Sequence, residues 1–204
     1  MKNKKISILT LAFAFLPSIA MSSSTFDFNS IPIGTGTPIT LSSNGITAVF
    51  SAPGDPGGFQ INPTFFSFPG NILYTPGING QDFENLDIAF SQLVSEIHFN
   101  FATNGAGPLT LIALSGGISG TQVGEVSVLG QPVLFFFPEG LLTFNGALFD
   151  TVKIIDSNDP NFAIGNVTVS AVPVPAAVWL FGSGLMGVLS FKRSKNKTAN
   201  VITA

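Results

Sequence analysis

The sequence predicts an all-β fold for most of the chain, an antiparallel β-sandwich of the jelly-roll type. Short runs rich in Val, Ile, Thr and Phe, which suit a pleated half-buried surface, alternate with clusters of turn-forming Gly, Pro and Asn. No run between the two ends shows the apolar period of an amphipathic helix. This pattern of short runs is typical of two packed antiparallel sheets.

The predicted sandwich covers residues 25–171, between two terminal segments of different composition. Its turns are marked by glycine and proline, most clearly at Pro53–Gly58 and Pro69–Asn71. The runs between the turns predict strands over Thr25–Phe28, Ile46–Phe50, Leu86–Phe90, Leu93–Phe101, Leu109–Leu114, Thr121–Leu129, Val133–Phe137, Leu141–Phe144, Thr151–Ile155 and Asn161–Ala171. The chain has no cysteine, but a domain of this size closes a core without disulfides.

Two of these strands alternate clearly enough to assign their faces. In Leu93–Phe101 the odd-numbered residues are expected to face the core. The even-numbered residues are then expected to face outward: Val94, Glu96, His98 and Asn100. In Asn161–Ala171 the apolar residues change parity after Ile164, which predicts a β-bulge at Gly165–Asn166, because glycine inside a strand often marks one.

Charge is divided unevenly along the chain. All eleven acidic residues lie between Asp27 and Asp159, whereas seven of the eight basic residues lie in the terminal segments. Between Ser22 and Ala171 the one basic residue is Lys153, so that region has a formal net charge of −10 with its histidine neutral. Nucleic acids and anionic lipid surfaces are bound through cations. The composition therefore excludes them as partners and favours divalent cations.

The N-terminus has the three parts of a secretory signal peptide, expected to cover residues 1–20 and to engage the Sec export machinery. Three lysines precede an apolar stretch of 11 residues, Ile6–Leu16, which is too short to span a bilayer. Ser18 and Ala20 then form a small-x-small cleavage motif. Cleavage is expected after Ala20, with Ser22 and Ser24 as alternatives.

The C-terminal segment, residues 172–197, has a proline-marked entry, an apolar run and a basic stop. The run predicts a transmembrane helix at about 176–191, and at about 1.5 Å per residue it covers roughly 24 Å of a hydrocarbon core of about 30 Å. Uncharged residues from Ala171 onward extend it. The basic stop at 192–197 is expected to face the cytoplasm, which leaves the preceding domain outside.

This tail closely resembles the PEP-CTERM sorting signal of exported bacterial proteins, in its variant with a Pro-x-Pro entry. The matching residues are Val172, Pro173, Pro175, Ala176, Ala177, Trp179, Leu180, Phe181, Gly182, Ser183, Gly184 and Leu185, followed by Lys192 and Arg193. Val174 replaces the glutamate of the eponymous motif. The resemblance implies a Gram-negative bacterium that makes exopolysaccharide, transient anchoring in the inner membrane, and processing by a membrane-embedded exosortase for release to the surface or the extracellular matrix.

The region before the tail also resembles the sandwich domains that commonly precede such tails. The likeness is carried by Thr25–Phe28, Ile33–Thr35, Ser95–Phe99, Phe149–Val152 and Phe162–Val167. Related domains often end in Phe-Ala-Ile-Asp-Asn-Val, so Gly165 replaces an aspartate here. A sandwich hosts many functions, and the resemblance implies the fold.

Catalytic chemistry has little support, and no enzyme is expected. His98, the only histidine, is expected to be a surface imidazole, and no Gly-x-Ser-x-Gly elbow occurs in the domain. Paired carboxylates could cleave a glycoside, but carboxylates are so frequent here that a pair means little. Aromatic platforms for sugars are also scarce, because the domain has a single tyrosine, Tyr74, and its phenylalanines are expected in the core. For Phe135–Phe137 both burial and exposure are left open.

Calcium is the one cofactor that the composition favours, since it takes oxygen ligands from carboxylates, amides and carbonyls. The candidate ligands form two clusters, Asp156, Asn158 and Asp159, and Asp82, Glu84 and Asp87. Neither matches an EF-hand loop, and both are also ordinary turn sequences. Asp27 is expected to join such a site if the sandwich brings the two ends of the domain together.

Three functions follow from these patterns. The first is an exported, non-enzymatic surface or matrix protein with a structural or adhesive role, associated with exopolysaccharide or biofilm. The second is a calcium-dependent carbohydrate-binding module that uses the polar residues Glu96, His98 and Asn100. The third, a secreted hydrolase, has only the abundant carboxylates in its favour.

Overall fold

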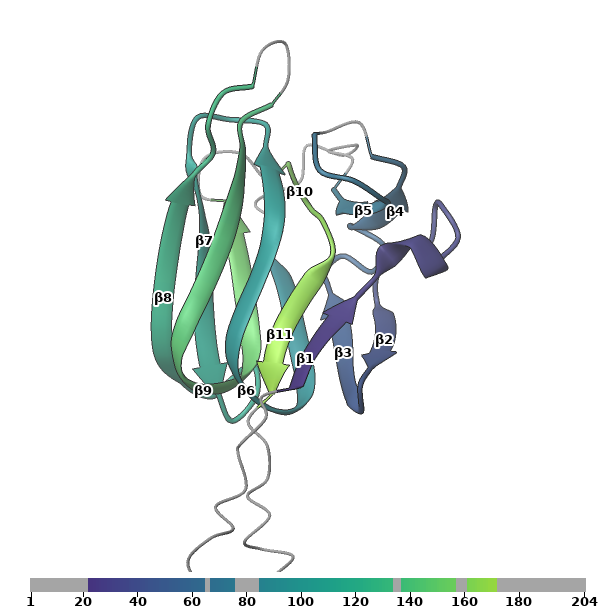
Figure 1. Ribbon diagram of the computed structural model, residues 1–204. Helices are drawn as coiled ribbons and strands as arrows, with labels where there is room; N and C mark the ends of the chain where they lie inside the picture. The colour runs from purple at the N-terminus through teal and green to yellow at the C-terminus, as the bar shows by residue number, and fades with distance from the viewer. Residues whose placement is uncertain (1–21, 65–66, 76–84, 134–136, 157–160, 172–204) are drawn as a thin grey trace, which may run out of the picture. The chain divides into compact units, whose positions relative to one another are not determined.

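The computed structural model describes residues 22–64, 67–75, 85–133, 137–156 and 161–171. These residues form a two-layered antiparallel β-structure, which confirms the predicted β-sandwich (Figure 1). The expected signal peptide, residues 1–20, and the expected sorting tail, residues 172–197, lie outside the described ranges. Within those ranges no helix has the length and apolarity needed to cross a membrane.

The described part of the chain contains eleven strands and one short 3-10 helix. They are β1 (Ser22–Phe26), η1 (Phe28–Ser30), β2 (Ile39–Ser43), β3 (Ile46–Ser51), β4 (Gln60–Asn62), β5 (Ile72–Tyr74), β6 (Leu86–Thr103), β7 (Pro108–Ser115), β8 (Thr121–Leu129), β9 (Glu139–Asp156), β10 (Phe162–Ile164) and β11 (Val167–Ala171).

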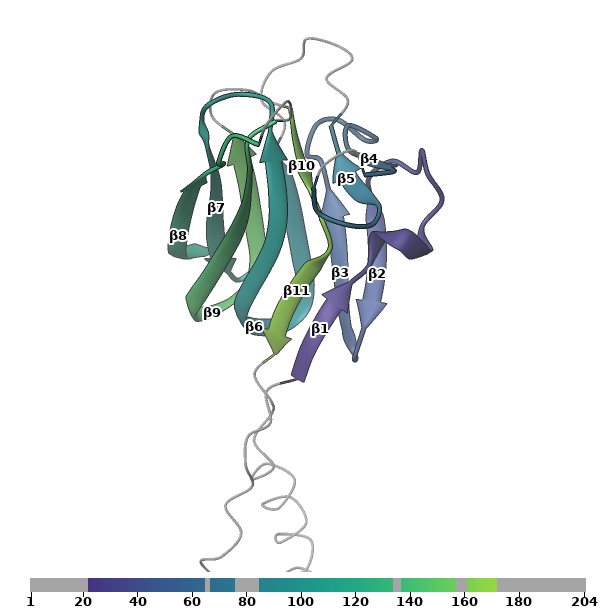
Figure 2. The ribbon, with the colours of Figure 1, turned by 45° about the horizontal axis from the view of Figure 1, so that its top comes forward.

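Two long strands, β6 and β9, run through both layers and hold them together. The second half of β6 pairs with β10 and β11 on one side and with the first half of β9 on the other, and β1 extends β11. These strands form what we call the front sheet. The first half of β6 pairs with β3 and with the second half of β9, and β2, β7 and β8 complete the back sheet (Figures 1 and 2).

The sequence predicted two strands, Leu86–Phe90 and Leu93–Phe101, but the structure has one long bent strand, β6, over both. Its pairing with β9 shifts register twice between Ala89 and Glu96. As a result Val94 is buried, whereas Leu93 is 42% exposed, so the faces assigned to the start of the second run were wrong. From Ile97 onward the expected alternation is confirmed.

The second long strand, β9, likewise joins the expected strands Leu141–Phe144 and Thr151–Ile155. The stretch between them, residues 145–148, is exposed, which is why the alternation breaks there. The strand expected over Val133–Phe137 is not found at its described ends, and residues 134–136 lie outside the described ranges. The strands β2, β4 and β5 were not expected; β4 and β5 have three residues each, too few for an alternating pattern to stand out.

The predicted bulge at Gly165–Asn166 is confirmed by strand register. Ile164 lies opposite Phe101, and Thr168 lies opposite His98. Four steps along one strand therefore face three steps along the other, which is the definition of a one-residue bulge. The side-chain Oδ1 of Asn166 accepts a hydrogen bond of 3.1 Å from the Phe28 backbone N–H and so links the bulge to η1.

The core lies between the two sheets and is rich in phenylalanine. Phe28 and Phe50 meet edge to face with ring centroids 5.3 Å apart, and Phe149 contacts Phe144 in the same way at 5.4 Å. Edge-to-face contacts suit the aromatic quadrupole and add to the free energy of burial. Burial of these rings confirms that most phenylalanines form the core, as expected.

A carboxylate closes the hairpin loop between β7 and β8. Asp150 on β9 accepts backbone hydrogen bonds from Gly116 at 3.0 Å and Gly117 at 2.8 Å. Both glycines have positive φ angles of 94° and 82°, a conformation that favours glycine. Partial burial tends to raise the pKa of Asp150, but the N–H groups of Gly117 and Gly116 and the Thr151 hydroxyl outweigh it and lower the pKa.

Replacing this carboxylate is expected to weaken the loop. We expect Asp150→Asn to lower the free energy of unfolding by about 1–2 kcal/mol at pH 7, because hydrogen bonds to a charged acceptor are lost at a site that solvent partly screens. The pKa of Asp150 is lowered on folding, so its stabilisation is present above its unfolded pKa of about 3.9 and is lost as the pH falls through the folded value. Urea unfolding of both proteins at pH 7 and pH 2.5 checks this. An equal difference at both pH values would contradict it.

Candidate functional site

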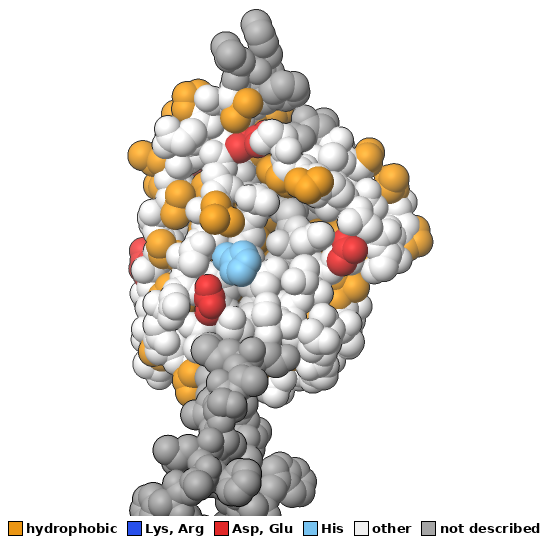
Figure 3. Space-filling view, viewed as in Figure 1, with side chains coloured by type: hydrophobic (Ala, Val, Ile, Leu, Met, Phe, Trp, Pro, Cys, Tyr) orange, Lys and Arg blue, Asp and Glu red, His pale blue; other side chains and the backbone are white. Residues whose placement is uncertain are grey.

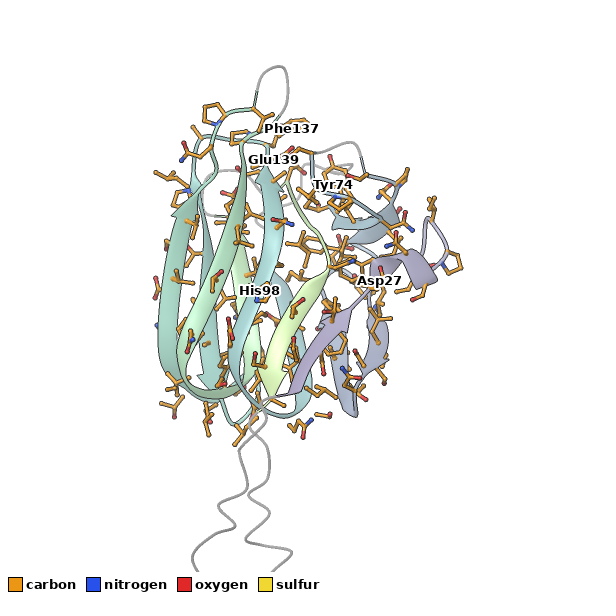
Figure 4. The ribbon with its side chains drawn as sticks, in the orientation of Figure 1. Asp27, Tyr74, His98, Phe137 and Glu139 are labelled. Atoms are coloured by element: carbon orange, nitrogen blue, oxygen red, sulfur yellow. The ribbon has the colours of Figure 1, made fainter. Side chains whose placement is uncertain are left out.

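A small pocket lies where the last residues of β6 meet the first residues of β10. It is shallow, with an enclosed volume of about 10 Å³, which is room for about one water molecule. The described lining residues are Tyr74, Ala102, Thr103, Asn104, Phe137, Asn161, Phe162 and Ala163. They come from four places in the chain, and strand register brings them together, since Ala163 lies opposite Tyr74 on one side and opposite Ala102 on the other. Figure 4 shows Tyr74 and Phe137 at this end of the sandwich.

The pocket wall is held by a segment that folds over the outer face of the front sheet. Phe68 and Ile72 are buried against Ala102 and Ala163 in a small cluster of their own, and Tyr74 packs beside them. The two alanines leave room for these larger side chains. Tyr74 is thereby fixed at the pocket by packing on a rigid sheet.

A buried carboxylate ties this segment to β9. Glu139 is 7% exposed, and its side chain accepts a hydrogen bond of 2.9 Å from the Ser67 backbone N–H and another from the Ser67 hydroxyl. The Thr75 N–H donates to the Phe162 carbonyl at 3.2 Å on the other side of the pocket. Glu139 therefore has a structural role, although it lies close to the pocket (Figure 4).

The rim of the pocket is ordered by backbone hydrogen bonds. The Thr103 N–H donates to the Pro138 carbonyl, and the Asn104 N–H donates to the Asn161 carbonyl, each at 3.0 Å. Phe137 precedes Pro138 and is 37% exposed. Of the three aromatic lining residues, Phe162 is buried against Phe59 in the core, so the site offers the side chains of Tyr74 and Phe137 with two asparagines and a threonine. None of its described lining residues carries a charge.

Three of the four residues that the sequence placed on the outer face of β6 are found there, Glu96, His98 and Asn100, whereas Val94 is buried. His98 has a side chain that is 41% exposed, and its Nδ1 lies 3.9 Å from Oε1 of Glu96, whose Oε2 accepts a hydrogen bond of 3.0 Å from the Ser170 hydroxyl. Asn100 is exposed further along the same strand. This face is the one turned to the viewer in Figure 3, with the histidine near its middle.

The calcium candidates do not come together in the described part of the structure. Asp82, Glu84, Asn158 and Asp159 lie outside the described residues. Asp87 lies opposite Lys153 on the outer side of the back sheet, whereas Asp156 alternates with Val152 and Ile154, which face the core. Within the described ranges no group of three His, Cys, Asp or Glu residues could hold a metal ion.

Asp27, the other candidate, has a local role. The two ends of the domain do lie together, because β1 pairs with β11. The Asp27 side chain, however, caps η1, accepting hydrogen bonds from the Asn29 backbone N–H at 2.9 Å and its side-chain amide at 2.6 Å. Asn29 in turn accepts a hydrogen bond of 2.8 Å from the Asn71 N–H. Asp27 therefore supports the segment that leads into the pocket wall.

Asp87 is a buried acid whose charge costs stability. Burial raises its pKa, and attraction to Lys153 offsets only part of that effect. Its Oδ1 has no hydrogen-bond partner among the described residues. Because the folded pKa lies above the unfolded value, the native state is penalised as the pH rises through the folded pKa, and the penalty is absent below the unfolded value of about 3.9.

Removing this charge is therefore expected to stabilise the protein. We expect Asp87→Asn to raise the free energy of unfolding by about 1 kcal/mol at pH 7 and to leave it unchanged at pH 3, where Asp87 is protonated. Chemical unfolding at both pH values measures the effect. A loss of stability at pH 7 would show that pairing with Lys153 outweighs burial.

Tyr74 and Phe137 were missed as site residues at the level of sequence. The domain's single tyrosine stands out there only for its scarcity, and Phe137 belongs to a phenylalanine run for which burial and exposure are equally compatible. Neighbouring prolines could have pointed to both residues. Tyr74 lies in a stretch flanked by proline, and Phe137 directly precedes Pro138, so both lie near loops, where binding residues concentrate. The residues of the sorting motif and the Ser18–Ala20 cleavage motif lie outside the described ranges.

No family model matches this chain, and no curated protein matches it either. Among solved structures it is similar to a low-affinity xylan-binding module, CBM86, from Roseburia intestinalis, at 13% identity and a TM-score of 0.34 over 72% of this chain and 94% of that chain. It is also similar to CsCBM6-3 from Clostridium stercorarium in complex with cellobiose, at 12% identity and a TM-score of 0.40 over 67% and 92%. A β-1,3-glucan-binding CBM6 from Bacillus halodurans gives 17% identity and 0.35 over 56% and 86%. At these values the similarity says nothing about what this chain binds.

Proposed function

We propose that this chain is an exported, non-enzymatic carbohydrate-binding protein that binds a sugar at the shallow pocket between Tyr74 and Phe137. The observation that carries the proposal is the composition of that pocket, two aromatic rings beside the amide side chains of Asn104 and Asn161. Sites for small organic ligands combine an apolar, largely aromatic lining with a few placed polar groups.

A sugar ring matches this lining better than other common ligands. The sugar has an apolar C–H face, which stacks on aromatic side chains. Its hydroxyl groups donate hydrogen bonds to amides and accept hydrogen bonds from them. An amide side chain offers both an acceptor oxygen and donor N–H groups. Uncharged lining residues favour an uncharged ligand group, because a charge would be desolvated there without compensation.

The terminal segments supply the rest of the proposal. We propose that residues 1–20 direct export and that the PEP-CTERM-like tail sorts the protein through an exosortase to the cell surface or matrix, where exopolysaccharide is the nearest ligand. The support is the sequence of the tail, including Pro173, Pro175 and the basic residues after the apolar run. Binding to this polymer would give the protein a structural or adhesive role.

A sedimentation assay tests the binding function. The full chain in a mild detergent is mixed with the source organism's exopolysaccharide, and with insoluble cellulose, β-1,3-glucan and xylan, in calcium and then in EDTA. We expect wild-type protein to sediment with at least one polymer. Phe137→Ala and Tyr74→Ala are expected to weaken retention at least about tenfold, or about 1.4 kcal/mol, and Tyr74→Phe to retain it.

Controls separate binding from folding in this assay. Ile118→Ala removes an exposed apolar side chain from the loop between β7 and β8, at the end of β7 remote from Asn104, and is expected to bind like wild type. Thermal unfolding of each variant confirms that it is folded. Full retention of Tyr74→Ala and Phe137→Ala would overturn the pocket as the site. Retention lost in EDTA would direct attention to Asp82, Asp87, Asp156 and Asp159.

A further inference from the structure

Beside the pocket, part of the outer surface of the front sheet forms what we call the shelf. It consists of Glu96, His98 and Asn100 from β6 and Leu141, Thr143 and Asn145 from β9. These six residues form three cross-strand pairs, Asn100 with Leu141, His98 with Thr143 and Glu96 with Asn145. Alternate residues of a strand share a face, so all six point away from the core.

The shelf is polar, and its charged group is held in place. Ser170 on β11 donates to Oε2 of Glu96, and His98 lies next to Oε1 of the same carboxylate. Thr168, opposite His98, exchanges a hydrogen bond of 3.0 Å with the Thr25 hydroxyl. Hydroxyl, amide, imidazole and carboxylate groups are thus arrayed on rigid strands, where they are positioned before any ligand arrives.

One large apolar side chain interrupts this polar surface. Leu141 is 56% exposed, beside Asn100, on the side of β9 that leads to the pocket. It lies four residues after Phe137 at the pocket rim, roughly 13 Å of extended chain at about 3.3 Å per residue. The pocket combines an apolar contact, Phe137, with polar groups that can bind hydroxyls. The shelf offers the same combination further along the sheet, with Leu141 as the apolar contact.

Charge restricts what the shelf can hold. Lys153 is the only Lys or Arg between residues 22 and 171, and it lies on the outer side of the back sheet opposite Asp87. The described part of the face shown in Figure 3 carries carboxylates and the histidine but no Lys or Arg. An anionic chain lying on it would meet Glu96, and the described residues of this face supply no Lys or Arg to offset the repulsion.

We infer that the binding site is elongated, running from the Tyr74–Phe137 pocket over Leu141 and Asn100 to His98, and that it takes several units of a neutral or amino-sugar chain rather than an acidic one. The inference rests on the proposed function. One sugar unit lies over the shallow pocket, and the shelf binds the units that follow. Leu141 contacts an apolar ring face, while Asn100 and His98 hydrogen-bond to hydroxyl groups.

Calorimetric titration of the full chain in detergent tests this with six sugars. They are the dimer and the hexamer of a neutral glucan (cello-oligosaccharides), of a basic glucosamine chain, and of an acidic galacturonic acid chain. We expect a neutral or basic hexamer to bind at least tenfold more tightly than its dimer, and the acidic hexamer to bind at least tenfold more weakly than the best of the others. Leu141→Ala and His98→Ala are expected to bring the hexamer to the affinity of the dimer and to leave the dimer unchanged.

Matched controls lie on the other sheet, where Ile112→Ala and Glu125→Gln alter outward side chains of β7 and β8 and are expected to change nothing. Equal binding of dimer and hexamer, an undiminished hexamer affinity in both shelf variants, or tightest binding of the acidic hexamer would each overturn the elongated site while leaving the pocket in place. Failure of all six sugars to bind would overturn the proposed function, and the elongated site with it.

Discussion

Val169→Asp is expected to unfold the sandwich, whereas Thr168→Asp, one residue earlier, is expected to leave it folded. Val169 is fully buried on the inner face of β11, opposite Ile97. The one Lys or Arg of the described residues, Lys153, lies on the outer side of the back sheet, so a carboxylate at position 169 has no partner among them. Burying an unpaired charge costs several kcal/mol, comparable with the entire stability of a small domain. Circular dichroism and urea unfolding of the two variants measure the difference.

This pair of substitutions is a direct test of the bulge at Gly165–Asn166. Without the extra residue, the parity set by Phe162 and Ile164 would place residue 168 inside and residue 169 outside. The two variants would then exchange behaviour. Stability of the Val169→Asp variant, with unfolding of Thr168→Asp, would therefore show that β10 and β11 form one unbroken strand.

Phe149→Ala is expected to lower the free energy of unfolding by about 3–5 kcal/mol. Phe149 is fully buried where β9 passes from the front sheet to the back sheet, and its ring contacts Phe90 at a centroid distance of 6.3 Å and Phe144 at 5.4 Å. Truncation removes the burial of the ring and both aromatic contacts, and it leaves a cavity between two strands whose bend restricts collapse. Urea unfolding gives the value.

A conservative variant at the same position shows whether the loss of stability comes from the lost volume or from the lost ring contacts. Phe149→Leu keeps most of the volume and loses the aromatic contacts, so it is expected to cost clearly less than alanine does. Equal losses in the two variants would assign the effect to the ring contacts. A loss below about 1 kcal/mol for alanine would mean that β9 closes over the cavity.

The predictions that succeeded depend on local alternation. The hairpin strand Thr121–Leu129 has the expected bounds, and Glu96, His98 and Asn100 face outward as expected. The bulge was also detectable, because an extra residue is the simplest way for the parity of a strand to change within a few positions. The long bent strands were not, since the exposed stretches inside β6 and β9 have the composition of turns.

The site itself could not be assembled from sequence, because its parts become neighbours only through strand register. Tyr74 and Ala102 are brought together by Ala163 between them, and Phe137 arrives from the start of β9. Nothing in a single sequence states that these positions share one end of the sheet. The polar shelf was partly recognised from β6 alone, but Leu141, which completes it, belongs to another strand.

The pairing of β1 with β11 has a mechanical consequence. Ser22 lies opposite Ala171, so both ends of the described domain leave from the end remote from Asn104 and Asn161 (Figure 2). If the protein is held by its C-terminal segment while its pocket grips a polymer, tension runs lengthwise along β11. That strand is hydrogen-bonded on both sides, to β1 and to β6, by bonds that lie across the direction of pull. Such bonds are loaded in shear and must break together. A strand that is peeled sideways off a sheet, in contrast, loses its hydrogen bonds one at a time.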